Sequence, residues 1–246
     1  MKDIAAIILA AGKGTRMRST LPKPLVPVLE RPMLSYLTTQ FKQAEVEEIF
    51  LIVGHGAEQV MEEMGNSYQY IIQKKQEGTA HAVLQCRGIF PRYEHCFVFV
   101  GDSPLISART IEELLSAHLA KENDCTFLTS FFDIDLPYAR IIRDESGVLI
   151  ACIEEKDCNQ EQKNIREFLS SHFIFKASIL NEYLPKIKPD PINGEYYLTD
   201  IIGLLLQDNK KVDTLSIPDY RELCGLNTPE EVKWAENILR QHTFSL

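Results

Sequence analysis

Residues 4–18, IAAIILAAGKGTRMR, decide the fold class of this 246-residue chain. Ile4–Ala10 is an apolar run that is too short for a typical helix, and Gly12 and Gly14 end it. A short apolar run closed by glycines is typical of a strand that is buried on both faces of a parallel sheet. The stretch therefore predicts a fully buried parallel strand followed by a glycine-containing loop.

The same pattern recurs twice further along the chain. Ile49–Val53 and Phe97–Val100 are apolar runs, and glycine follows each of them directly. Thr110-x-x-Glu113 predicts a capping box at the start of a helix. Between the strands, two amphipathic segments predict helices with the apolar positions Met33, Leu34, Leu37 and Phe41, and Ile111, Leu114, Leu115 and Leu119. Alternating buried strands and helices predict a doubly wound α/β sheet, which binds ligands at the carboxyl ends of its strands.

The pattern changes at about residue 124, where the strand-like segments become shorter and polar loops separate them. These segments are residues 126–131, 138–143, 148–153 and 172–175, and an apolar helix is predicted over Tyr196–Leu206. Thr228-Pro229-Glu230-Glu231 predicts a capping box and a terminal helix. The apolar face of that helix would carry Val232, Ala235, Ile238 and Leu239.

No Pro-, Gly- or Ser-rich linker divides the sequence, so we expect one domain over residues 1–246. Within it we expect a first lobe over residues 1–123, a smaller α+β lobe over 124–227, and a C-terminal helix over 228–246.

Composition excludes several classes of protein. The chain has 26 Lys and Arg against 35 Asp and Glu, a net charge of −9, which argues against a nucleic-acid partner. No apolar run reaches the roughly 20 residues of a membrane span. The six cysteines show no metal-ligand spacing, so we expect mostly core thiols in a reduced compartment. These features predict a cytoplasmic protein without a membrane partner, either a monomer or a small homo-oligomer.

The loop after the first strand is a local exception to the acidic charge. Lys13, Arg16, Arg18 and Lys23 lie between Ile4 and Leu29, and that segment contains no acidic residue. Glycines and cations in one loop suit the binding of an anion such as phosphate. A dinucleotide fingerprint would need a third glycine at position 17, and a P-loop would need one at position 7. The chain has neither of them.

The complete motif is more specific than these glycines. L-A-A-G-x-G-T-R-M followed by L-P-K resembles the signature of the sugar-1-phosphate nucleotidyltransferases. The resemblance is strongest to the N-acetylglucosamine-1-phosphate uridylyltransferase domain of the bacterial bifunctional enzyme. It continues along almost the whole chain, in the segments Gln73-x-x-Gln76-Glu77-Gly78-Thr79-Ala80-His81-Ala82, Gly101-Asp102-Ser103-Pro104-Leu105, Glu154-Glu155-Lys156-Asp157, Glu195-Tyr196-Tyr197-Leu198-Thr199-Asp200-Ile201 and Gly225-Leu226-Asn227.

The resemblance implies a Rossmann-like, doubly wound mixed sheet with a smaller α+β sugar-binding lobe, the nucleotide-diphospho-sugar transferase type. It also implies roles for individual residues. Arg16 would hold the triphosphate, and Lys23 would position the reacting phosphates. Asp102, which follows a buried strand, would act in catalysis and hold a Mg²⁺ or Mn²⁺ ion with Asn227, because oxygen ligands suit such ions.

The resemblance also assigns the two substrates to separate sets of residues. The nucleotide would contact Leu9, Ala10, Ala11, Gly12, Gly14, Thr15, Gln73, Gly78 and Thr79. The sugar would contact Ala139, Glu154, Leu169 and Thr199. An amide such as that of Gln73 can hydrogen-bond the edge of a uracil. We expect His81 to be packed, Tyr196 and Tyr197 to form walls or core, and the other histidines to have no chemical role.

The sugar-binding half departs from the family pattern at three places. Ala139 stands where the family commonly has glycine, and Leu169 where it has asparagine. Val100 stands where close relatives often have tyrosine. A polar contact to the sugar would therefore be lost, although Ser170, Ser171 or His172 could compensate.

The leading hypothesis is a metal-dependent transferase that condenses a nucleoside triphosphate, first of all UTP, with a sugar 1-phosphate, first of all N-acetylglucosamine 1-phosphate. The alternatives are the same chemistry on another hexose or amino-sugar 1-phosphate or another nucleotide, and a non-catalytic protein that binds nucleotide sugars. The bifunctional family continues into a β-helix, so the sequence leaves open a natural stand-alone enzyme or part of a longer protein.

Overall fold

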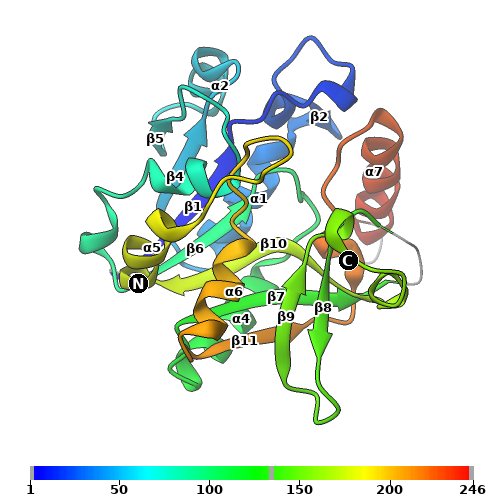
Figure 1. Cartoon of the computed structure of the whole chain (residues 1–246). Helices are drawn as coiled ribbons and strands as arrows, with labels where there is room; N and C mark the ends of the chain where they lie inside the picture. Colours follow the sequence, from blue (N-terminus) through cyan, green and yellow to red (C-terminus); the bar gives the residue numbers. More distant parts are fainter. Residues whose placement is uncertain (1–2, 133–135, 244–246) are drawn as a thin grey trace.

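The computed structural model describes residues 3–132 and 136–243, which include one mixed sheet of nine strands (Figure 1). The strand order along its main path is β11-β7-β10-β6-β1-β4-β5, and β8 and β9 form a hairpin that joins it through β10. The strands are β1 (Ile4–Ala10), β4 (Glu48–Val53), β5 (Gln69–Ile72), β6 (His95–Val100), β7 (Cys125–Phe131), β8 (Ala139–Arg143), β9 (Leu149–Ile153), β10 (Glu167–Lys176) and β11 (Val212–Ser216); β2 (Pro27–Val28) and β3 (Arg31–Pro32) form a separate pair.

The predicted parallel strands form one half of this sheet. β1 lies between β4 and β6 and is parallel to both, and β5 continues the parallel set. β10 is antiparallel to both β6 and β7, so it connects this half to the later strands. The mostly parallel α/β sheet predicted from the sequence is therefore confirmed, and the later segments belong to the same sheet.

Helices cover both faces of the sheet, as a doubly wound fold requires. Ala5 and Ile7 of β1 pack in the core beneath α3, α5 and α6, whereas Ala6 and Ile8 pack in the core beneath α1, α2 and α4. The helices are α1 (Met33–Gln43), α2 (Ala57–Met64), α3 (Thr79–Leu84), α4 (Ala108–Ala120), α5 (Ala177–Tyr183), α6 (Asp200–Gln207) and α7 (Pro229–Thr243). Because β1 is buried on both faces, its sequence reads as a continuous apolar run.

Three local predictions need correction. The N-cap of α4 is Ser107, whose Oγ accepts from the amide of Thr110, so Thr110 lies inside the helix. The helix predicted over Tyr196–Leu206 begins only at Asp200, because the backbone of Tyr196 is hydrogen-bonded to the start of α3. The strand predicted over residues 172–175 extends over the whole of β10.

The C-terminal capping box is confirmed. The amide of Glu231 donates to Thr228 Oγ1 at 3.2 Å, and the amide of Thr228 donates back to Glu231 Oε2 at 3.0 Å. Ala235 is completely buried in a small core with Val28 and Leu226. Helix α7 is therefore fixed against the segment that precedes it.

The cysteine prediction holds in the main. Cys86, Cys96, Cys125 and Cys158 are buried, and Cys152 and Cys224 are partly buried. All six are free thiols. Among the described residues, no helix combines the length and the apolar character needed to cross a membrane.

Candidate functional site

The loop after β1 holds Lys23 close to the carboxyl end of the sheet. Gly14 has φ of +59°, and a Cβ at this position would lie 2.6 Å from the Cβ of Lys23. A side chain at position 14 would therefore both strain the backbone and displace the lysine. Lys23 begins a short 3-10 turn in which Pro24 and Leu25 are buried. The lysine is thus part of a packed structure, whereas Arg16 extends from an exposed turn.

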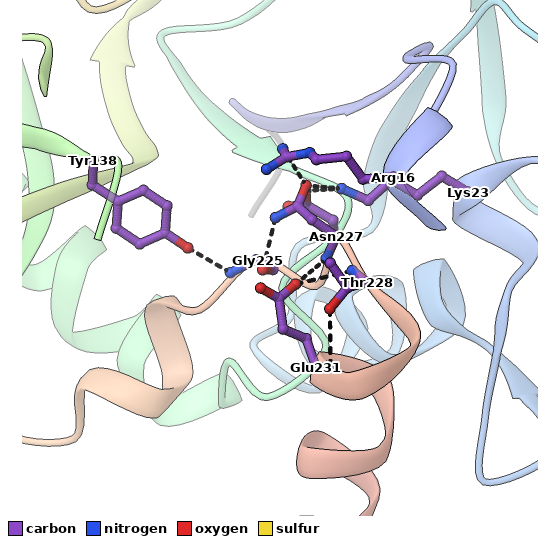
Figure 2. Close-up of polar contacts among 8 residues, drawn as sticks. Arg16, Lys23, Tyr138, Gly225, Asn227, Thr228 and Glu231 are labelled. Carbon is purple, nitrogen blue, oxygen red and sulfur yellow. Dashed lines mark hydrogen bonds and ion pairs between the residues drawn. The ribbon is translucent and has the colours of Figure 1, made fainter. Parts of the chain in front are cut away.

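Four residues from distant parts of the chain meet at one point. Lys23 Nζ donates to Asp102 Oδ2 at 2.5 Å and to Asn227 Oδ1 at 2.8 Å. Arg16 donates to the same Asn227 oxygen at 3.0 Å, and Figure 2 shows both cations directed at this amide. The structure therefore brings together all the residues that the sequence assigned to catalysis and metal binding.

The amide of Asn227 is oriented by its surroundings. Its Nδ2 donates to the carbonyl of Gly225 at 3.0 Å, which leaves Oδ1 facing the two cations. The backbone amides of Asn227 and Thr228 both donate to Glu231 at the start of α7. The amide of Gly225 donates to the hydroxyl of Tyr138 at 3.1 Å (Figure 2). Burial raises the pKa of Tyr138, so this hydroxyl stays protonated.

Asp102 and Asn227 suit a divalent cation that also binds substrate. One carboxylate and one amide oxygen converge on a single positive group, the ammonium of Lys23. Residues 3–132 and 136–243 contain no group of three or more His, Cys, Asp or Glu side chains that could hold a metal. Mg²⁺ commonly binds through one or two protein oxygens and completes its shell with water and phosphate. The donor set therefore fits an ion that phosphate helps to hold.

A cavity of about 450 Å³ lies between the loop after β1, the start of α3 and Tyr197. Seven of the nine residues predicted to contact the nucleotide line it: Leu9, Gly12, Gly14, Thr15, Gln73, Gly78 and Thr79. Ala10 and Ala11 are buried and are not part of this lining. The exposed Lys13 does line it.

The start of α3 is fixed against the segment that contains Tyr196. Gly78 has φ of +106°, and a Cβ there would lie 2.4 Å from the carbonyl oxygen of Tyr196. That carbonyl accepts from the amide of Ala80 at 2.9 Å, and the amide of Leu198 donates to Thr79 Oγ1 at 2.9 Å. Glycine is therefore required at position 78, because two backbone segments approach each other there.

A second cavity, of about 260 Å³, adjoins the first, since Thr79 and Tyr197 line both. All four residues predicted to contact the sugar line it: Ala139, Glu154, Leu169 and Thr199. Arg16, Asp102 and Asn227 line it as well. Arg16 and the two residues predicted to hold the metal, Asp102 and Asn227, therefore face the second cavity, next to the first.

The three departures from the family pattern fall together in this second cavity. Ala139 and Leu169 are partners across β8 and β10, and both are buried. Val100 lines the cavity with them. One wall is therefore apolar, while Glu154 and Thr199 supply polar atoms elsewhere.

An irregularity in β10 brings two serines into the same cavity. The register with β7 shifts between Leu169 and Phe173, and Ser171 has φ of +63°. This left-handed backbone favours glycine and costs a serine about 1 kcal/mol. Ser170 and Ser171 line the cavity.

His172 does not line either cavity, but it supports Ser170. Its Nδ1 lies 2.9 Å from Ser170 Oγ, and its ring packs edge-on against Phe99 at 4.7 Å. Burial lowers the pKa of His172 to about 4, so the ring is neutral near pH 7. Of the three residues considered as compensation for Leu169, the two serines reach the cavity, and the histidine positions one of them.

Sequence reasoning missed the contacts of two residues of the site. Tyr197 was expected to be wall or core, and it forms part of the wall of both cavities. Lys156 Nζ lies 4.5 Å from the centre of its ring, and Asn193 donates to its hydroxyl. His81 was expected to be packed; it is partly buried, and it also contacts Gln73 at 3.0 Å. Both residues lie in segments that carry the family resemblance, and this indicated that they belong to the site. Nothing in the sequence indicated these contacts.

Comparisons with known proteins agree with this architecture. The bifunctional protein GlmU of Staphylococcus epidermidis is 40% identical over 237 residues, which is 96% of this chain and 52% of that protein. GlmU of Enterococcus faecalis is 38% identical over 242 residues, 98% of this chain and 53% of that protein. The chain thus spans about half the length of these relatives.

Solved structures of nucleotide-sugar enzymes share the fold. A Bacillus anthracis protein provisionally assigned as a glucose-1-phosphate thymidylyltransferase superposes with a TM-score of 0.78 and 21% identity, covering 96% of this chain and 95% of that one. A UDP-glucose pyrophosphorylase with bound UDP-glucose gives a TM-score of 0.76 and 19% identity, covering 97% and 98%. At these identities the likeness establishes the Rossmann-like nucleotidyltransferase fold.

The family model of the MobA-like NTP transferase domain matches residues 6–172, which run from β1 to the middle of β10. This range contains the glycine loop, Lys23, Gln73 and Asp102. The chain belongs to the MobA-like NTP transferase domain family.

Proposed function

We propose that the protein transfers a nucleotidyl group from a nucleoside triphosphate to a sugar 1-phosphate and releases pyrophosphate. The observation that supports this most strongly is the cluster of Arg16, Lys23, Asp102 and Asn227, three of which line the second of two adjoining cavities. In the reaction, an oxygen of the sugar phosphate attacks the α-phosphorus in line, a bond to that phosphorus forms, and the bond to pyrophosphate breaks. Such a reaction between two polyanions depends on positioning and positive charge.

The two cations of the cluster would have different tasks. Arg16 is exposed and borders the second cavity, and its neighbour Thr15 lines the first, so Arg16 would reach the leaving phosphates without a large desolvation cost. Lys23 is held by Gly14 and by two oxygen partners, and it would position the sugar phosphate and offset charge in the transition state. The positive charge of this loop, in an otherwise acidic protein, would therefore serve to bind the substrate phosphates.

Asp102 and Asn227 would hold a Mg²⁺ or Mn²⁺ ion together with substrate phosphates. When bound, the ion supplies charge stabilisation at the phosphorus that reacts. The capping contacts of Glu231 fix the backbone of Asn227 independently of any ligand. The protein would therefore hold Asn227 in position before the ion or the substrates bind.

UTP is the nucleotide that we assign first. Gln73, Gly78 and Thr79 meet in the first cavity, and they would contact the edge of the base. N-acetylglucosamine 1-phosphate remains the first sugar assignment, with Glu154 and Thr199 as hydroxyl partners.

A second candidate is the same chemistry on another hexose 1-phosphate. The apolar wall made by Val100, Ala139 and Leu169 favours it, because the asparagine that the family would place at position 169 is absent. A site selects strongly for a polar group when its own buried polar atoms would otherwise stay unpaired. Weaker selection for the N-acetyl group follows from the loss of one such atom.

A screen of pyrophosphate release tests this proposal. The four nucleoside triphosphates are combined with N-acetylglucosamine, glucosamine and glucose 1-phosphates in the presence of Mg²⁺. Release that requires UTP, a sugar 1-phosphate and the metal together is expected. If the protein binds a nucleotide sugar tightly but releases no pyrophosphate with any pair of nucleoside triphosphate and sugar 1-phosphate, the non-catalytic alternative is supported instead.

A further inference from the structure

The side-chain amide of Gln73 is held in one orientation. Gln73 follows β5, is only 3% exposed and borders the first cavity. Its Nε2 lies 3.2 Å from the carbonyl oxygen of Gly78 and 3.0 Å from His81 Nδ1. A carbonyl oxygen can only accept, so the atom facing it must be the NH₂ group. The carbonyl oxygen Oε1 of Gln73 is then the atom left to meet a ligand.

The imidazole of His81 can accept from only one of two amides. Gln73 Nε2 lies at its Nδ1, and Gln85 Nε2 lies 3.2 Å from its Nε2. A neutral ring has one acceptor nitrogen. Gln85 is exposed and also donates to the carbonyl of His81, so its NH₂ can turn to water.

The balance between the two amides favours Gln73. A buried N–H group that loses its acceptor is left unsatisfied and destabilises the protein, whereas an exposed one can hydrogen-bond to water. Glu77 Oε2 lies 3.5 Å from His81 Nε2, and a carboxylate there favours a proton on that nitrogen. Both effects leave Nδ1 as an acceptor for Gln73.

We propose that His81 is a positioning residue for base selection, which rests on the assignment of Gln73 to the base of UTP. With Nδ1 as acceptor, His81 acts together with the carbonyl of Gly78 to keep the NH₂ of Gln73 turned away from the ligand and its carbonyl turned towards it. An acceptor at this place suits uracil, whose ring N3 carries a hydrogen. It disfavours cytosine, because the N3 of cytosine carries a lone pair, and two hydrogen-bond acceptors that face each other repel.

Two substitutions separate this role from simple packing. His81→Leu removes the acceptor and keeps an apolar side chain of similar size, and His81→Ala replaces it if leucine is not tolerated. His81→Asn can place an amide oxygen close to the position of Nδ1 and so restore the acceptor. Gln85→Ala on the same helix turn is the matched control, because it removes only the exposed partner of the ring.

The measurement is the dissociation constant for UTP and for CTP with Mg²⁺, followed by kcat and KM with one sugar 1-phosphate. The wild type is expected to prefer UTP. His81→Leu should lower the UTP-to-CTP ratio by about tenfold or more, mainly through KM, since an unpaired polar contact is worth about that factor. His81→Asn and Gln85→Ala should keep most of the ratio.

An unchanged ratio in folded His81→Leu would overturn the positioning role and leave the proposed function standing. A fall in kcat that is equal for both nucleotides, with the ratio preserved, would overturn it as well, because it would indicate a packing role. Equal affinity of the wild type for UTP and CTP would overturn both this role and the assignment of UTP, while nucleotidyl transfer itself could still be measured.

Discussion

Asp102→Asn separates the catalytic role of the cluster from its structural role. The substitution removes one negative charge and keeps the size of the side chain. Asp102 lies against Gly225, where an added Cβ would be 3.0 Å from Oδ1, and asparagine, which has the same shape, fits the space that aspartate occupies. Asparagine can still accept from Lys23, so the fold should be preserved.

The expected effects on stability and on turnover differ in size. At 2.5 Å and an effective dielectric of about 20, the attraction between Lys23 and Asp102 is about 7 kcal/mol before the cost of removing both charges from water. Both side chains keep contact with solvent, 14% and 24% exposed, so the net contribution to stability should be about 1 kcal/mol or less. Loss of charge stabilisation in a transition state costs about 3–4 kcal/mol, or ~100- to 1000-fold in kcat.

The assay is pyrophosphate release at saturating UTP, sugar 1-phosphate and Mg²⁺, with thermal unfolding measured on the same samples. A fall in kcat of at least about 100-fold with a melting temperature within a few degrees of the wild type is expected. Turnover close to that of the wild type at saturating Mg²⁺ would refute the role of Asp102. Loss of the cooperative unfolding transition would show that the residue is structural.

Three further predictions concern the basic loop, acid stability and the sugar. In steady-state assays, Arg16→Ala should lower kcat/KM for the triphosphate, and Lys23→Ala should lower kcat as well. Lys13→Ala and Arg18→Ala should have smaller effects. Equal, mild effects at all four positions would instead indicate that the loop attracts the substrates only through its overall positive charge. Burial lowers the pKa of His172 to about 4, below the ~6.5 of an unfolded histidine, so the unfolded chain takes up this proton first as the pH falls. The stabilisation is present above pH ~6.5 and is lost towards pH 4, and the loss reaches about 2 kcal/mol by pH 5. Urea denaturation of His172→Leu should therefore show a shallower decrease between pH 7 and 5 than the wild type, and parallel curves would contradict this. The ratio of kcat/KM for N-acetylglucosamine 1-phosphate over glucose and glucosamine 1-phosphates should stay below about 100, and Leu169→Asn with Ala139→Gly should raise it; a larger ratio in the wild type would show that Ser170 and Ser171 replace the lost amide.

The sequence predicted the parallel half of the sheet because its strands are buried on both faces. The run Ile4–Ala10 became β1 with the same bounds. The shorter strands β5 and β11 were harder to predict from the sequence, because they are only partly buried and carry no continuous apolar run. The start of α6 was missed because tertiary hydrogen bonds hold Tyr196 outside the helix, and local sequence carries no sign of them.

The candidate site was predictable wherever a motif carried the residue. Arg16, Lys23, Asp102 and Asn227 were selected from separate motifs, and the structure brings them into hydrogen-bond contact. The contact of His81 with Gln73 depends on how α3 packs behind β5, so spacing alone could not reveal it. The bulge that turns Ser170 and Ser171 into the second cavity likewise depends on the pairing of β10 with β6, β7 and β8.

Transfer of a nucleotidyl group to a sugar phosphate gives a product that ³¹P NMR identifies. The protein is incubated with UTP, Mg²⁺ and a hexose 1-phosphate, with a matched sample that contains EDTA. We expect the two coupled signals of a diphosphate diester and a separate pyrophosphate signal, and neither in the EDTA sample. UTP that stays intact, or UMP and pyrophosphate with the sugar phosphate unchanged, would contradict the account.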